Sequence, residues 1–153
     1  MAEVYFEWHP SPILIAEQIG ELAKLLDDLH LPLEASVEVV GQSFLQAFES
    51  QGPGWAPWAE SYAKYAETHN KGILWQSGSL AESQTNPANY LIAGNALFWT
   101  GAEAPFYWIF HHEGTVKMPQ RDWIEVTEVT ASELIEIFAK YIDASLHETG
   151  WNG

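Results

Sequence analysis

The chain has 153 residues, 47% of them hydrophobic, and a formal net charge of −15 from 21 acidic and 6 basic residues. This composition predicts one globular domain rather than a disordered chain. The charge argues against binding to nucleic acid or to an anionic membrane, because both need clustered Lys and Arg. The lack of cysteine excludes disulfides and zinc–thiolate sites. We find no apolar run of about 20 residues and no signal peptide, and we expect folding in a cytoplasm.

The first elements that we expect are a short strand and two helices. Aromatic and β-branched side chains favour a strand at residues 3–9. Ser11 followed by Pro12 predicts a helix start, and residues 30–32 then end that helix. A second helix is expected from about Leu33 to Ser50, antiparallel to the first. Gly41 on its inner face either allows the two helices to approach closely or is simply tolerated.

The middle of the chain predicts a turn, a tryptophan-containing loop and a short helix. Residues 51–54 are a Gly-Pro turn cluster. Trp55 and Trp58 follow it, and we weigh two interpretations of them, an exposed contact between subunits or a loop folded onto the core. A short helix at 61–69 is ended by Gly72. Two apolar triplets around Gly94 and Asn95 then predict a β-hairpin with a type II′ turn.

The last third predicts a helix at 106–112, a glycine stop, a buried strand and a long helix. Arg121 is the only arginine of the chain and lies at the mouth of the expected strand, residues 119–126. We expect it to pair with a carboxylate of its own subunit or of the next one, because its planar fork suits bidentate binding. The final helix begins near Thr130, where Glu133 completes a capping box. Its apolar face consists of Leu134, Ile135, Phe138, Tyr141, Ile142 and Leu146. The ordered core is expected at about 12–147.

A metal or catalytic site is the least favoured interpretation. His111, His112, Glu113 and His69 are possible metal ligands. However, adjacent helical residues point about 100° apart, and the motifs that place two ligands on one face are absent. The chain also lacks a Gly-x-Ser-x-Gly elbow and any cysteine nucleophile. We therefore expect no catalytic residue, no metal and no cofactor.

Tyr107 is followed by His111 four residues on and by Gly114 three residues later, and Pro119 and Arg121 then precede an apolar segment. This order resembles the phage virion-morphogenesis family, proteins that complete the tail and join it to the head. In that family a Tyr, a His, a Gly and a Pro-x-Arg at these places precede an apolar strand. Further matching positions are Phe48, Gly54, Trp55, Pro57, Gly78, Leu80 and Ser83. The resemblance runs from about Val37 to Ile142.

The resemblance implies an α+β fold, with amphipathic helices packed against a small antiparallel sheet in a single domain. It also implies a non-enzymatic virion protein of the phage neck or tail end, made in the host cytoplasm. We expect a ring of identical subunits, a hexamer, which contacts neighbouring neck or tail proteins and which DNA passes without specific binding. The residues expected to have structural or interface roles are Trp55, Trp58, Tyr107, His111, Gly114, Pro119 and Arg121.

Two other functions stay open at this point. An acidic chain could mimic DNA and inhibit a nucleic-acid enzyme, although the carboxylates are scattered along helix faces rather than clustered. A His/carboxylate metal-dependent hydrolase comes last. The segment between Gly94 and Tyr107 looks longer than is usual in the family, which predicts that the hairpin is an insertion relative to the family.

Overall fold

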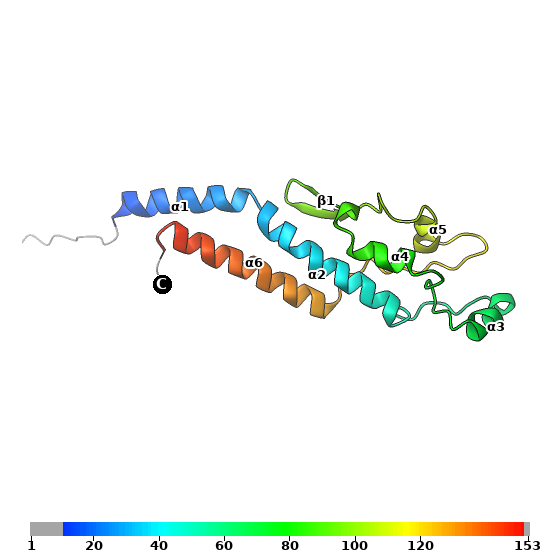
Figure 1. Cartoon of the computed structure of the whole chain (residues 1–153). Coiled ribbons are helices and arrows are strands. Elements are labelled where there is room, and N and C mark those ends of the chain that lie inside the picture. Colours follow the sequence, from blue (N-terminus) through cyan, green and yellow to red (C-terminus); the bar gives the residue numbers. More distant parts are fainter. Residues whose placement is uncertain (1–10, 152–153) are drawn as a thin grey trace, which may run out of the picture.

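The computed structural model describes residues 11–151, so the strand expected at residues 3–9 lies outside the described part. The longer elements are the helices α1 (Pro12–Asp27), α2 (His30–Glu49), α3 (Glu60–Thr68), α5 (Trp108–Glu113) and α6 (Glu128–Glu148), and the strands β1 (Tyr90–Ala93) and β2 (Ala96–Trp99). Three single turns of helix precede the strands, namely α4 (Ser79–Glu82), η1 (Ser83–Thr85) and η2 (Pro87–Asn89). The predicted α+β class is confirmed (Figure 1).

The break between α1 and α2 lies before the proline, not at it. Ser11 caps α1 as predicted, since its side chain accepts a hydrogen bond from the N–H of Leu14. The prediction that residues 30–32 end this helix was wrong, because His30 already begins α2. The carboxylate of Asp28 accepts a hydrogen bond from the N–H of His30 at 2.9 Å. Pro32 falls in the first turn of α2, where a missing N–H removes no helical hydrogen bond.

The expected antiparallel pairing of α1 with α2 was also wrong. In Figure 1, α2 follows α1 along the molecule, and α6 runs back beside both. The hydroxyl of Tyr141 on α6 lies 2.8 Å from the carbonyl oxygen of Leu25 and 3.0 Å from that of Asp28. A distant helix therefore satisfies the free carbonyls at the end of α1. The antiparallel partner of α2 is α6, almost 100 residues further along the chain.

Gly41 permits a close approach, but to a different partner from the one expected. A Cβ atom at this position would lie 2.9 Å from the carbonyl oxygen of Gln84 and 3.3 Å from the hydroxyl of Tyr90. The segment that packs here is η1, not α1. The glycine therefore brings the backbone of the middle segment against α2.

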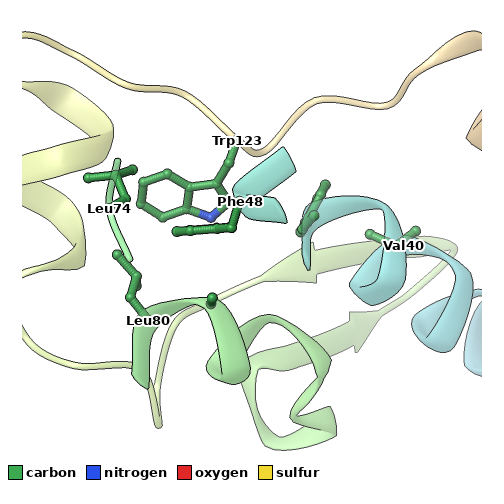
Figure 2. Close-up of a cluster of buried hydrophobic side chains, with 7 residues drawn as sticks. Val40, Phe48, Leu74, Leu80 and Trp123 are labelled. Atoms are coloured by element: carbon green, nitrogen blue, oxygen red, sulfur yellow. The ribbon is translucent and has the colours of Figure 1, made fainter. Parts of the chain in front are cut away.

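The hydrophobic core lies between α2, the turns at 74–81 and the segment after α5 (Figure 2). Phe48 is fully buried, with its ring centroid 5.2 Å from that of Trp123 and 5.5 Å from that of Trp55. The indole N–H of Trp123 donates to the side-chain oxygen of Gln84 at 2.9 Å. Gln84 is itself buried and donates to the carbonyl oxygen of Leu80 at 2.8 Å. This buried polar side chain is thus hydrogen-bonded on both sides, as burial requires.

The hairpin is confirmed, with Tyr90 opposite Trp99 and a φ of +58° at Gly94, the first turn position. The strand predicted at residues 119–126 was wrong. Among the described residues this segment belongs to no ladder and crosses the core as an extended loop. The carboxylate of Asp122 accepts the N–H of Ile124 at 2.9 Å. This local hydrogen bond uses the backbone N–H of Ile124, which a neighbouring β-strand would otherwise accept.

The final helix begins slightly earlier than predicted. Thr127 is the N-cap of α6, and its side chain accepts a hydrogen bond from the N–H of Thr130. Thr130 is therefore the third helical residue, not the cap. Its hydroxyl donates to that of Ser43 on α2 at 2.7 Å, so it joins the first turn of α6 to α2.

Candidate functional site

Five of the seven residues expected to have structural or interface roles line one cavity of about 640 Å³, which we call the Arg121 pocket. Its walls come from α3 with the loop before it, from residues 74–80, from the region of α5 and from the loop at 117–121. The expected site residues that it contains are Trp58, Tyr107, His111, Pro119 and Arg121, together with the motif residues Gly78 and Leu80. The two segments that carry the resemblance, residues 74–80 and 107–121, are about 30 residues apart in the sequence and meet at this cavity.

Arg121 is buried in the wall of the pocket, with 4% of its surface exposed. Its Nε and Nη2 atoms donate to the carbonyl oxygens of Ala56 and Pro57, each at 3.1 Å. The guanidinium carbon lies 5.7 Å from the ring centroid of Trp58, within the range of a cation–π contact. Burial lowers the pKa of Arg121.

Among the described residues, Arg121 has no carboxylate partner of the kind that we expected. Over residues 11–151, no Asp or Glu oxygen comes within 4.0 Å of the guanidinium. The carbonyls of Ala56 and Pro57 occupy two of its donor groups instead. Among the described residues the intrachain alternative is therefore not met, and pairing with the next subunit stays a prediction.

His111 links α5 to the loop that carries Arg121. Its carbonyl oxygen accepts the backbone N–H of Arg121 at 2.8 Å, and its ring packs edge-on against that of Tyr107. The Nδ1 atom is buried and has no hydrogen-bond partner among the described residues. Burial, and secondarily the charge of Arg121, lower the pKa of His111. The neutral imidazole is thus the favoured form in the folded chain.

Trp55 and Trp58 lie in a loop that folds onto its own chain. The indole N–H of Trp55 donates to the carbonyl oxygen of Asp122 at 2.6 Å, and that of Trp58 donates to Lys71 at 3.4 Å. Trp55 also packs edge-on against the buried Phe48. Neither ring is among the exposed large hydrophobic side chains. This placement favours the core-packing interpretation over the exposed contact.

Gly114 shapes the loop that closes the pocket. Its φ is +75°, and a Cβ atom there would lie 2.8 Å from the backbone nitrogen of Gln120 and 3.1 Å from the carbonyl oxygen of Met118. Thr115 and Met118 exchange backbone hydrogen bonds across the loop. Only a residue without a side chain fits so close to this returning backbone, and the return brings Pro119 to the pocket.

The possible metal ligands are not brought together. Within residues 11–151, no group of three His, Asp or Glu side chains could hold a metal ion. His69 stacks on Tyr65 in the region of α3. The Nδ1 of His112 lies 3.2 Å from Asp122 Oδ1, but without the geometry of a hydrogen bond. The adjacent residues His111 and His112 therefore lie in two different environments.

Two further residues of the pocket were missed at the level of sequence. Lys117 lies at the pocket and is exposed, whereas the hydroxyl of Tyr62 is buried without a hydrogen-bond partner among the described residues. Lys117 carried a usable signal, because it stands four residues before Arg121 in a chain with only 6 basic residues. Tyr62 carried none, since only the tertiary structure brings α3 to this cavity.

Comparison with models of known protein families, with curated proteins and with solved structures finds no match to this chain. Across residues 11–151, none of the helices has the length and apolar character needed to cross a bilayer.

Proposed function

We propose that this protein is a non-enzymatic structural subunit of a bacteriophage virion, located at the neck or tail end. In this proposal copies of the chain form a closed ring that completes the tail or joins it to the head. The observation that supports assembly is the amount of apolar surface that the isolated chain leaves exposed. The phage assignment rests on the resemblance, and six of its twelve matching residues line the Arg121 pocket.

The apolar face predicted for α6 is only partly used within the chain. Leu134, Phe138, Tyr141 and Leu146 are half-buried, but Ile135 is 68% exposed and Ile142 is 40% exposed. These two isoleucines are seven residues apart and therefore lie on the same side of the helix. Apolar side chains gathered in this way mark a contact surface more often than a solvated one.

A second exposed apolar surface lies on the hairpin. Leu91 and Phe98 are cross-strand neighbours, so their side chains lie on the same face, and both are about half exposed. The surface on α6 and the surface on the hairpin belong to different elements. Two unlike surfaces on one subunit are what a head-to-tail ring requires, because each contact joins one surface of a copy to a different surface of the next.

The net charge of −15 opposes this assembly. Salt screens repulsion between exposed charges over about 8–10 Å near physiological ionic strength, whereas apolar contacts hardly weaken. We therefore expect oligomers to form more readily in moderate salt or millimolar divalent cation than in dilute buffer. Native mass spectrometry and light scattering across a salt series measure this dependence, and electron microscopy of the purified protein would show a ring.

A matched pair of double variants tests the surface on α6. Ile135→Asn with Ile142→Asn removes the exposed apolar side chains without changing the charge. Glu136→Asn with Lys140→Asn places the same residue at two exposed positions of the helix and also leaves the net charge unchanged. The first variant should remain monomeric at concentrations where the second assembles. Equal assembly of the two, or assembly that falls as salt rises, would contradict the proposal.

The wall facing the DNA path in such a ring should be net acidic, so that DNA is repelled rather than held. A gel-shift assay at physiological salt should show no retention of double-stranded DNA. Tight binding in that assay would rule out a repelling channel.

A further inference from the structure

We propose that the Arg121 pocket receives the carboxylate of an acidic side chain from a second copy of the chain, so that the site is complete only in the assembly. This inference rests on the proposed ring, and it adds a specific contact to it. The pocket has the charge, the free donor groups and the shape for such a guest.

The donor groups of Arg121 are only partly used. A guanidinium has five N–H groups in a planar fork. Nε and Nη2 each donate to one backbone carbonyl, while Nη1 has no hydrogen-bond partner among the described residues. The two carbonyls and the ring of Trp58 are uncharged, so they do not neutralise the cation. A buried charge without a counter-ion is costly, and an opposite charge brought to it removes much of that cost.

The rest of the pocket has a second cation and two polar atoms that are unpartnered in the described part of the chain, which can donate to an anion where they carry a hydrogen. The Nδ1 atom of His111 and the hydroxyl of Tyr62 both belong to lining residues, and both are buried without a hydrogen-bond partner among residues 11–151. Lys117 adds a second cation. No Asp or Glu is among the lining residues. In a chain with 21 acidic and 6 basic residues, such a cavity differs in sign from the net charge of the chain.

A carboxylate of another copy is the guest that matches these features. Each copy carries 21 acidic residues, so any neighbour in a ring brings carboxylates to the contact. The carboxylate and the guanidinium are both planar and can form two parallel hydrogen bonds. Trp58, Leu80 and Met118 supply apolar wall against which the methylene groups of a Glu side chain can lie. A pair enclosed in this way is screened little by salt, so it agrees with assembly that salt promotes.

Ser77 gives the test, because it lines the pocket and is exposed. Ser77→Glu places a carboxylate of the same chain at the pocket, where it competes with an incoming one. Ser77→Gln has the same size and no charge. Ser79 is exposed, is not a lining residue and bonds to Ser77 across 2.9 Å. Ser79→Glu and Ser79→Gln therefore control for the added charge and for the lost hydrogen bond.

The measurement is the protein concentration at half-assembly, by sedimentation velocity at fixed moderate salt, with thermal melting to show that each variant is folded. We expect Ser77→Glu to raise this concentration about tenfold over Ser77→Gln, and Ser79→Glu to differ much less from Ser79→Gln. The two Ser77 variants could assemble alike, or Ser79→Glu could match Ser77→Glu. Either result would contradict the proposed carboxylate contact but not the proposed ring. If the wild type stays monomeric at every salt concentration, both the proposed ring and the proposed carboxylate contact are wrong.

Discussion

The two ends of the molecule differ in how they bury apolar side chains. At the core end, Phe48 and Trp123 are buried within the chain and Gln84 is hydrogen-bonded between them. Along the arm, formed by α1 and residues 135–148 of α6, no described side chain of α1 is buried, and Ser145 is the buried residue of that part of α6. Both ends carry the same kind of amphipathic helix.

The difference shows what an apolar stripe on a helix does and does not predict. The stripe predicts that one face leaves water, because apolar surface is costly to hydrate. It does not say whether the covering surface comes from the same chain. At the core end the turns at 74–84 and Trp123 cover α2. Along the arm the single chain supplies too little cover, and the uncovered isoleucines motivate the proposed assembly.

The largest expected effect separates the two ends directly. Phe48→Ala should lower the free energy of unfolding by about 3–5 kcal/mol, because it opens a cavity among well-packed rings. Ile135→Ala on the arm should change it by about 0.5 kcal/mol or less in the monomer, since its side chain is mostly exposed. Urea unfolding at low protein concentration measures both. Similar losses for the two variants would erase the distinction between core and arm.

A smaller loss is expected for Gly114→Ala at the pocket. The new methyl group meets the returning backbone of residues 118–120 at a positive φ, so we expect a loss of about 2–4 kcal/mol. Gly54→Ala is the matched control, because its φ is +78° but nothing lies within 4 Å of the new atom. Backbone strain alone should then cost about 1–2 kcal/mol. Equal losses in thermal or urea unfolding would show that the loop can move away.

Replacing a helix glycine by alanine should change the free energy of unfolding in opposite directions at the two ends. Gly41→Ala should destabilise by about 1–3 kcal/mol, because its methyl group would lie 2.9 Å from the carbonyl oxygen of Gln84. Gly20→Ala on the arm meets nothing within 4 Å and should stabilise by about 0.5–1 kcal/mol through helix propensity. Stabilisation by Gly41→Ala would mean that η1 is not packed closely against α2 at this position.

The smallest effect is a pH dependence from His111. Its pKa is lowered in the folded chain, so below its ordinary pKa of about 6.5 the unfolded chain binds more protons there than the folded chain does. The stability that His111 contributes is therefore present above that pH and is lost as the pH falls. His111→Gln should reduce the loss of stability between pH 7 and pH 5, whereas His30→Gln, at an exposed position, is the control. An unchanged slope in His111→Gln would contradict this assignment.

Part of the candidate site was predictable from the sequence. Tyr107, His111 and Arg121, which the resemblance singled out, do line one cavity. The partner of Arg121 was not predictable, because the carbonyls of Ala56 and Pro57 lie 65 and 64 residues away along the chain. Backbone carbonyls occur at every position, so no residue type announces such a partner. A search for carboxylates could not have found it.

The sequence by itself determined the features that depend on a few neighbouring residues. Ser11 starts a helix, Gly94 turns a hairpin and Gly114 ends α5, because caps and positive φ angles are satisfied locally. The tertiary structure alone decided that α2 pairs antiparallel with α6. It also decided that residues 119–126 form a loop and not the predicted strand. These outcomes depend on contacts between distant residues, such as the hydrogen bond from Trp55 to Asp122, 67 residues apart. Local propensity is the same for every possible partner, so only the packed chain selects among them.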